Sequence, residues 1–445
     1  MYENIIFCPK NLVFRKINDL YIVLNPDAPN LMVVDDVGKE IFELCKNGEK
    51  IENVIKCLCE KYADEVAKED LVTLITSAIK TGFLRTSSPI SSREVKRLGS
   101  VERLLYLHLH LTRACNLRCK HCFVSAGEFV RDELWEDKIL TLIKELRDLG
   151  GEYLILTGGE PLLRKKVLYS AIKEARSQGL KGISVETNGT LLSEEDAAFF
   201  KRYEVGVGVS LDGVTPETND YIRGAGVFER SIQAIKTLVK NDVRVSIGMT
   251  LMHHNIAEAE KMVFLAKELG VSFLSINPIR IAGRAKENMD LAVSPNETVH
   301  ALVGTWKLAR RLGVPTRMGE LSNHIRQLGK KESCGAGVTT LGVAANGDVY
   351  PCNMFVGGSM KVGNVREGTL KRVMETSDIL KKFRNFNVLD TECCDCELKY
   401  ICGGCPAEAF EEYGDIKKRT PWCPVRKEIG WEIITNIAHE LWQET

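Results

Sequence analysis

The middle of the chain contains six short apolar runs, each of which predicts a β-strand. Segments with the spacing of amphipathic helices separate them, and strands alternating with helices predict a parallel sheet covered by helices. Every run ends in polar or glycine-rich residues, and enzymes built from such units place their chemistry at that edge of the sheet. The six runs are 105–111, 153–157, 179–186, 205–211, 243–251 and 273–279.

The N-terminal part of the chain shows a different pattern. Residues 11–25 predict two short strands that meet at a turn near Asn18, and residues 30–34 predict a third strand. Asp35 is the expected N-cap of the helix that follows. A Ser- and Pro-rich stretch at 86–92 predicts a linker to the rest of the chain. Three helical patterns precede this linker, at 37–45, 51–62 and 68–81.

Charge and hydropathy narrow the classes of partner. The 60 Lys and Arg residues balance the 60 Asp and Glu residues, so net charge gives no reason to expect a nucleic-acid or membrane-surface partner. No apolar run approaches the roughly 18 residues of a membrane span. The N-terminus lacks the basic start and apolar stretch of a signal peptide. We therefore expect a cytoplasmic protein.

The fifteen cysteines are many for a cytoplasmic chain of 445 residues. In a reducing compartment, metal binding explains such a number better than disulfides do. Four of them lie in the first 60 residues, and the three at helical positions have the pattern of small buried side chains. The other eleven lie in two groups, at 115–122 and 334–423. Two metal-bearing regions are therefore predicted.

The first group follows directly on the predicted strand 105–111 and has the spacing C-x3-C-x2-C. Cys115, Cys119 and Cys122 can each bind a different iron of one four-iron cluster. Three ligands leave one iron open to a small molecule, as a catalytic zinc keeps a free position. His121, between two of these cysteines, is not expected to be a ligand. The alternatives are a zinc knuckle or three unrelated thiols.

This stretch resembles the signature of the radical S-adenosylmethionine (SAM) enzymes, and Gly-Gly-Glu-Pro at 158–161 corresponds to a second motif of that family. The resemblance implies a partial (β/α)6 barrel in which the Glu160 carboxylate pairs with the amino group of SAM. Asp212 also matches the family pattern. The alternative for the tetrapeptide is a turn before a helix. The alternative for Asn188, Ser210, Asp212 and Arg223 is that they cap helices or order loops. The implied SAM-binding residues are Gly158, Gly159, Glu160, Asn188, Ser210 and Arg223.

The second cysteine group resembles the SPASM extension of radical SAM enzymes, which implies two auxiliary 4Fe–4S clusters and therefore three clusters in all. A pair of zinc sites is the alternative, because C-x2-C is also a zinc spacing. Two departures from the family concern the first auxiliary set: Thr340 stands where some relatives have cysteine, and only two residues separate Cys402 from Cys405. Either one iron of that cluster is open or Cys394 completes it. The implied ligands are Cys334, Cys352 and Cys405 for the first cluster, and Cys393, Cys396, Cys402 and Cys423 for the second.

The N-terminal pattern resembles the peptide-recognition domains fused to enzymes that modify ribosomally made peptides, including the chaperone of pyrroloquinoline-quinone assembly. Such domains bind a leader peptide by strand addition. An ordinary winged-helix-like accessory domain is the alternative. The predicted organisation is a recognition domain at 1–88, a linker at 89–104, a radical SAM barrel at 105–312 and a SPASM domain at 313–445.

Together these resemblances imply an enzyme similar to the thioether synthases of sactipeptides and ranthipeptides. In such enzymes a 5′-deoxyadenosyl radical removes a hydrogen atom from a precursor peptide, and the carbon then bonds to a cysteine sulfur. The implied partners are that peptide and a reductant such as flavodoxin or ferredoxin; no residue is assigned as a catalytic acid or base. The alternatives are carbon–carbon or carbon–oxygen crosslinking, sulfatase maturation, quinone or haem cofactor synthesis, and a non-enzymatic iron–sulfur carrier or scaffold.

Overall fold

A computed structural model describes most of the chain. The described residues are 4–25, 30–62, 66–86, 104–318, 334–366, 368–402, 404–421, 423, 427, 428, 430, 431 and 435. The predicted linker lies outside them except at its two ends. Within the described residues, no helix has the length and apolar character needed to cross a bilayer.

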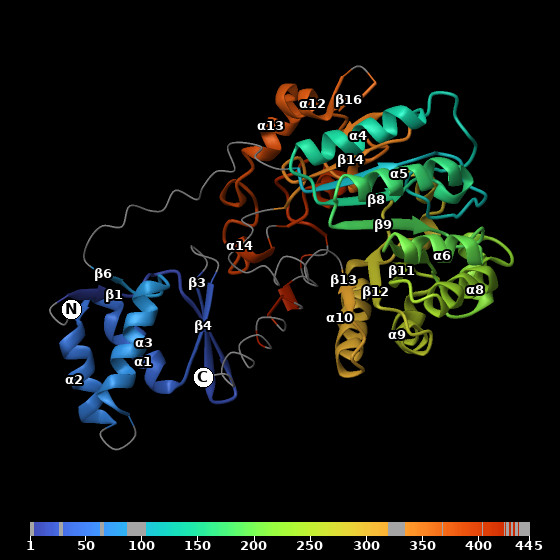
Figure 1. The fold of residues 1–445 in the computed structure, drawn as a ribbon. Coiled ribbons are helices and arrows are strands. Elements are labelled where there is room, and N and C mark those ends of the chain that lie inside the picture. The colour runs from blue at the N-terminus through green and yellow to red at the C-terminus, as the bar shows by residue number, and fades with distance from the viewer. Residues whose placement is uncertain are drawn as a thin grey trace.

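The N-terminal part contains the three strands and three helices that the sequence predicts (Figure 1). The strands form an antiparallel sheet in the order β2-β3-β4. The Asp35 carboxylate accepts a hydrogen bond of 2.7 Å from the Gly38 amide, so the predicted N-cap is confirmed. The sequence did not reveal a second small sheet, in the order β5-β1-β6, because its strands have only two or three residues. They are β1 (Ile5–Phe7), β5 (Glu49–Lys50) and β6 (Arg85–Thr86). The main elements are β2 (Val13–Ile17), β3 (Leu20–Asn25), β4 (Asn30–Val34), α1 (Asp36–Leu44), α2 (Ile51–Lys61) and α3 (Lys68–Lys80).

The six predicted strands of the middle region are all present and lie side by side in chain order. Each pairs in parallel with the next, which confirms the repeated strand–helix unit of a partial barrel. The strands are β7 (Tyr106–His110), β8 (Tyr153–Thr157), β9 (Gly182–Thr187), β10 (Gly206–Ser210), β11 (Val245–Leu251) and β12 (Phe273–Pro278). The helices that follow them in turn are α4 (Glu136–Asp148), α5 (Lys165–Ser177), α6 (Glu194–Arg202), α7 (Pro216–Arg223), α8 (Val227–Lys240), α9 (Ala259–Glu268) and α10 (Pro295–Arg311).

The sheet continues beyond the six predicted strands at both edges. β13 (Thr316–Met318) pairs in parallel with β12, and β14 (Thr340–Val343) pairs in parallel with β7. β15 (Asp348–Tyr350) and β16 (Gly363–Asn364) then extend the β14 side in antiparallel fashion. The C-terminal region therefore begins as a neighbour of the strand that leads into the first cysteine group.

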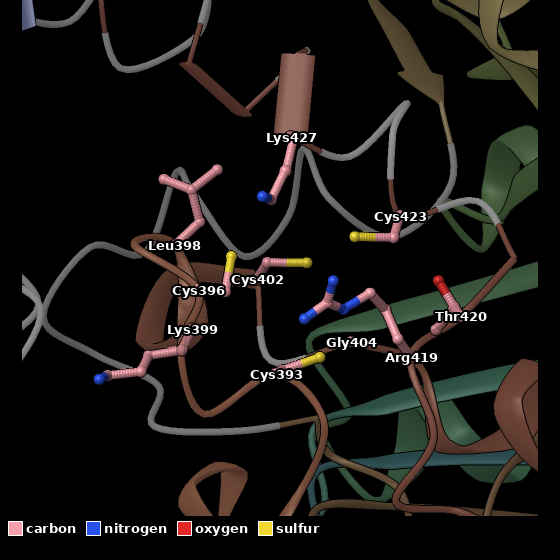
Figure 2. A pocket seen from close by; sticks show the side chains of 10 residues that line it. All are labelled: Cys393, Cys396, Leu398, Lys399, Cys402, Gly404, Arg419, Thr420, Cys423 and Lys427. Carbon is pink, nitrogen blue, oxygen red and sulfur yellow. The ribbon is translucent and has the colours of Figure 1, made fainter.

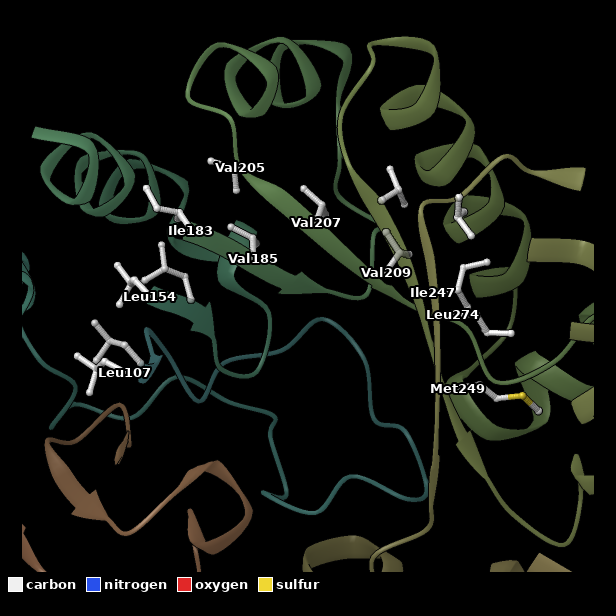
Figure 3. Close-up of a cluster of buried hydrophobic side chains, with 14 of the residues drawn as sticks. Leu107, Leu154, Ile183, Val185, Val205, Val207, Val209, Ile247, Met249 and Leu274 are labelled. Carbon is white, nitrogen blue, oxygen red and sulfur yellow. The ribbon is translucent and has the colours of Figure 1, made fainter. Parts of the chain in front are cut away.

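The two faces of the sheet differ in chemistry because side chains alternate along a strand. On β11, Val245, Ile247 and Met249 are buried. Figure 3 shows Ile247 and Met249 on the side of the covering helices, with the labelled side chains of the other strands. The alternate positions carry smaller or polar residues, and a Cβ added at Gly248 would meet no atom within 4 Å. The sheet therefore has one fully packed apolar face and one more open polar face.

The C-terminal third consists of short elements and loops. It contacts the N-terminal sheet at Trp431, where the Arg15 guanidinium lies 4.7 Å from the centre of the indole ring. The indole N–H of Trp431 also donates a hydrogen bond of 2.5 Å to the Glu397 carboxylate. The helices of this region are α12 (Leu370–Thr376), α13 (Asp378–Arg384), α14 (Lys399–Cys402) and α15 (Pro406–Tyr413).

Candidate functional site

The three cysteines of the first group lie in one loop at the carboxyl end of β7, as the sequence predicts. The Cys115 amide donates to the Gly127 carbonyl at 2.7 Å, which closes the loop on itself. Backbone amides of Leu117 and Ala126 lie 3.4 and 3.3 Å from the sulfurs of Cys115 and Cys122. Burial raises the pKa of the Cys119 thiol to about 11, so a bound cation is needed to hold that sulfur as a thiolate. Three sulfurs on one ordered loop fit a cluster with an open iron.

The two glycines of the Gly-Gly-Glu-Pro motif lie against this loop. The Gly159 amide donates to the Thr112 carbonyl at 2.7 Å, and the Glu160 amide donates to the Ala114 carbonyl at 2.8 Å. A Cβ at Gly159 would lie 2.1 Å from the Ala114 oxygen, and one at Gly158 would lie 2.5 Å from the Thr112 oxygen. The motif therefore needs glycine so that the end of β8 can reach the cysteine loop, a reason that the sequence analysis did not identify.

The Glu160 carboxylate is completely buried and ties together the ends of two strands. It accepts hydrogen bonds from the Leu162 amide at 3.0 Å, the Thr187 hydroxyl at 2.7 Å and the Asn188 amide at 2.8 Å. Burial raises the pKa of Glu160, while the three donors favour its charged form. Glu160 thus has a structural role beside its predicted contact with SAM, which stays a prediction.

Replacing Glu160 by glutamine should therefore destabilise the site although the two side chains have the same shape. The amide NH2 group would face at least one of the three donors, and a buried donor left without an acceptor costs about 1–3 kcal/mol. We expect a lower thermal unfolding midpoint and a loss of iron from the reconstituted protein. Glu217→Gln, at an exposed position of α7, is the control and should leave both measurements unchanged. Equal behaviour of the two variants would contradict the structural role of Glu160.

Asn188, Ser210 and Arg223 lie at the same edge of the sheet as the cysteine loop. The Asn188 side-chain amide donates to the Asn116 side chain at 3.0 Å and lies 3.9 Å from the Cys115 sulfur. Ser210 is the half-buried last residue of β10. Arg223 is the last residue of α7, and its Nη1 lies 4.0 Å from the Cys119 sulfur. The fold brings these predicted residues together, and their roles in SAM binding remain predictions.

Two residues at this edge were missed by the sequence analysis. Arg284 donates to the carbonyls of Cys119 at 3.0 Å and Ala126 at 2.7 Å, which braces the cysteine loop from the segment after β12. His110, buried at the end of β7, forms a hydrogen bond of 2.8 Å with the Asn353 side chain, next to Cys352. Burial lowers the pKa of His110. The alternation of leucine and histidine along β7 was the available signal for His110.

Four C-terminal cysteines line one cavity that encloses about 380 Å³, part of it open to solvent. Figure 2 shows their sulfurs around a common space into which Arg419 extends. No three His, Cys, Asp or Glu side chains in the described parts of the chain are arranged to hold a single metal ion. Four thiolates around one space are the ligand set of a 4Fe–4S cluster, and they can also bind zinc. These cysteines are Cys393, Cys396, Cys402 and Cys423, the set predicted for the second auxiliary cluster.

The cysteines predicted for the first auxiliary cluster also come together, in a separate small core. Cys405 is a buried member of this core together with Tyr350, Phe355 and Phe383, and the half-buried Cys334 and Cys352 pack against the core. Among the described residues, the buried hydroxyls of Thr339 and Thr340 have no hydrogen-bond partner. Cys394 is not among the residues that line the four-cysteine cavity. The assignment of Cys334, Cys352 and Cys405 as the ligands of one cluster remains a prediction.

Comparison with protein families agrees with this geometry. The sequence model of the Radical SAM superfamily matches residues 109–266. The SPASM model, described as an iron–sulfur cluster-binding domain, matches residues 334–397, and the model of coenzyme PQQ synthesis protein D matches residues 21–84.

Individual proteins resemble the chain over most of their lengths. An AdoMet-dependent heme synthase of Methanosarcina barkeri is 31% identical over 338 residues, which cover 71% of this chain and 95% of that protein. The mycofactocin maturase MftC of Mycobacterium ulcerans is 30% identical over 312 residues, which cover 67% of this chain and 82% of that protein.

Two solved structures share the fold. The structure titled native anSMEcpe with bound AdoMet has a TM-score of 0.63 at 21% identity and covers 75% of this chain and 99% of its own. Streptococcus suis SuiB bound to the precursor peptide SuiA has a TM-score of 0.60 at 16% identity and covers 93% of this chain and 98% of its own.

Proposed function

Because this chain belongs to the radical SAM superfamily, with SPASM and PqqD-type domains, we propose that it is a maturase that installs a thioether crosslink in a ribosomally synthesised precursor peptide. Members of this superfamily bind a 4Fe–4S cluster and SAM, and the SPASM domain binds auxiliary iron–sulfur clusters. We also propose the domain boundaries 1–88, 89–104, 105–312 and 313–445.

We propose specific ligands for each cluster. Cys115, Cys119 and Cys122 would hold the catalytic cluster, and the two C-terminal sets would hold the auxiliary clusters. When bound, these clusters and SAM supply hydrogen-atom abstraction from carbon and one-electron transfer. The loop contacts of Gly159 and Arg284 fix the cysteines, and the apolar core around Cys405 excludes water. We propose a flavodoxin or ferredoxin as the reductant.

The N-terminal domain carries the proposal of a peptide substrate. The PqqD match runs from β3 to the end of α3 and so includes most of the β2-β3-β4 sheet. The edge strands of such a sheet present backbone groups to which an extended leader peptide can add as a further strand. The maturase MftC and the peptide-bound SuiB, both similar to this chain, support the same substrate class.

The first auxiliary set favours a thioether over other crosslinks. Only three cysteines gather there, and Thr340 occupies the position where some relatives have a fourth. A substrate cysteine would supply the missing thiolate. Thioether formation removes a hydrogen atom from carbon and a proton from sulfur, and the one remaining electron needs a nearby acceptor.

The test uses the precursor peptide that this proposal expects among the short reading frames beside this protein's gene, incubated anaerobically with reconstituted enzyme, SAM and reductant. We expect a product that has lost two hydrogen atoms and one iodoacetamide-reactive cysteine, with no product from the Cys115→Ala/Cys119→Ala/Cys122→Ala variant. The same mass change with every cysteine still reactive would overturn the thioether and favour a carbon–carbon or carbon–oxygen crosslink. A peptide without cysteine would also overturn it.

A role in haem synthesis is the second candidate, because the M. barkeri heme synthase is similar to this chain over 95% of its own length. It would leave the PqqD-type domain without a function. Conversion of a porphyrin precursor to haem, followed by its absorbance while the peptide stays unmodified, would favour this candidate.

A further inference from the structure

A buried ion pair lies beside one of the three cysteines of the catalytic loop. Asp212 is fully buried after β10, and Arg223 is only 7% exposed at the end of α7. The Arg223 Nε lies 2.7 Å from the Asp212 Oδ2. The Nη1 of the same guanidinium lies 4.0 Å from the Cys119 sulfur. The Arg223 guanidinium therefore holds a full positive charge next to the Cys119 sulfur, and it also contacts the negative charge of Asp212.

Backbone contacts fix both members of the pair. The Asp212 Oδ1 accepts a hydrogen bond of 2.7 Å from the Thr250 amide at the end of β11. The Lys120 amide donates to the Ile222 carbonyl at 3.0 Å, which ties the end of α7 to the cysteine loop. His121 closes the arrangement, with its Nε2 at 3.4 Å from the Asp212 carboxylate. The charges are thus positioned by the same elements that position the cysteine.

We propose that Arg223 and Asp212 set the reduction potential of the catalytic cluster through the charge at the Cys119 sulfur. Both are positioning residues in this role. A reduced cluster carries one more negative charge, so a nearby cation stabilises it and a nearby anion destabilises it, and burial strengthens both effects. Arg223 is the member in contact with the sulfur, and Asp212 moderates its charge. The inference rests on the proposed ligand role of Cys119.

The test is an anaerobic redox titration of the full-length protein, followed by electron paramagnetic resonance. The catalytic cluster is identified as the signal that Cys115→Ala/Cys119→Ala/Cys122→Ala lacks. Arg223→Gln should shift its midpoint to a more negative potential, and Asp212→Asn should shift it to a more positive one. Arg223→Lys keeps the positive charge, so its midpoint should lie close to that of the wild-type protein. Lys201→Gln, which removes one charge of an exposed ion pair, is the matched control and should cause no shift.

The outcomes separate this inference from the proposed ligands. A signal that survives the triple cysteine replacement would show that the ligand assignment is wrong. With that assignment intact, shifts of the same sign in Arg223→Gln and Asp212→Asn would indicate loosened packing and overturn the inference. If Arg223→Gln does not retain the cluster, Asp212→Asn decides alone, and an unchanged or more negative midpoint overturns the inference.

Discussion

Replacing Cys115, Cys119 and Cys122 together by alanine should lower the iron content of the reconstituted protein from about twelve to about eight atoms per chain. These are the three cysteines of the loop after β7, so one cluster would lose every protein ligand. SAM cleavage should fall below detection, because the open iron that holds SAM is lost with the cluster. Iron and sulfide analysis, with quantification of 5′-deoxyadenosine, measures both effects.

The control replaces three cysteines that lie outside both groups. Cys57 is exposed, and Cys8 and Cys59 are half-buried in the N-terminal domain; their joint replacement by alanine should leave about twelve irons. A wild-type content of about four irons that falls to none, with zinc retained, would mean that the C-terminal cysteines form a zinc fold. The auxiliary-cluster part of the proposal would then be wrong, and the radical assignment would survive.

Gly159→Ala should disrupt the same loop without removing a ligand. The added Cβ would lie 2.1 Å from the Ala114 oxygen and 2.6 Å from its carbonyl carbon, so the backbone of one segment must move. Such overpacking costs about 1–3 kcal/mol, and the movement would break the hydrogen bond from the Gly159 amide to the Thr112 carbonyl. We expect a lower unfolding midpoint together with the loss of about a third of the iron.

Gly248→Ala provides the comparison, since that glycine lies in β11 of the same sheet and its Cβ would meet no atom within 4 Å. It should retain the wild-type unfolding midpoint and iron content. If the two alanine variants lose iron equally, the close approach of the end of β8 to the cysteine loop is not what holds the loop in place.

The sequence predicts the long elements well, for physical reasons. The six parallel strands are buried apolar runs that end in turn residues, so each carries its own signal. The C-x3-C-x2-C loop, the Gly-Gly-Glu-Pro motif and the predicted N-cap at Asp35 are equally local. The proximity of the cysteine loop and the Gly-Gly-Glu-Pro motif then follows from the parallel sheet, which brings the carboxyl ends of its strands to one edge.

The features that the sequence analysis missed depend on contacts between distant segments. Arg284 braces the cysteine loop only because the segment after β12 folds back over it. The bond between His110 and Asn353 joins residues 243 positions apart. Strands such as β5, β6 and β16, with two residues each, have too few positions for any periodicity. Glycine is needed at 158 and 159 because the backbones of Thr112 and Ala114 lie against them, and only the folded structure shows this close approach.

The pairing of β14 with β7 has a mechanical consequence. Neighbouring strands of a sheet are spaced by about 4.8 Å and are locked in register by their backbone hydrogen bonds. Tyr106 in β7 lies opposite Thr340 in β14, and Leu109 lies opposite Val343. The segments that lead to the catalytic and auxiliary cysteines thus belong to one rigid ladder. Under the proposed ligand assignment, a hinge motion between these two segments would have to break this ladder, so we expect substrate entry to leave their separation unchanged.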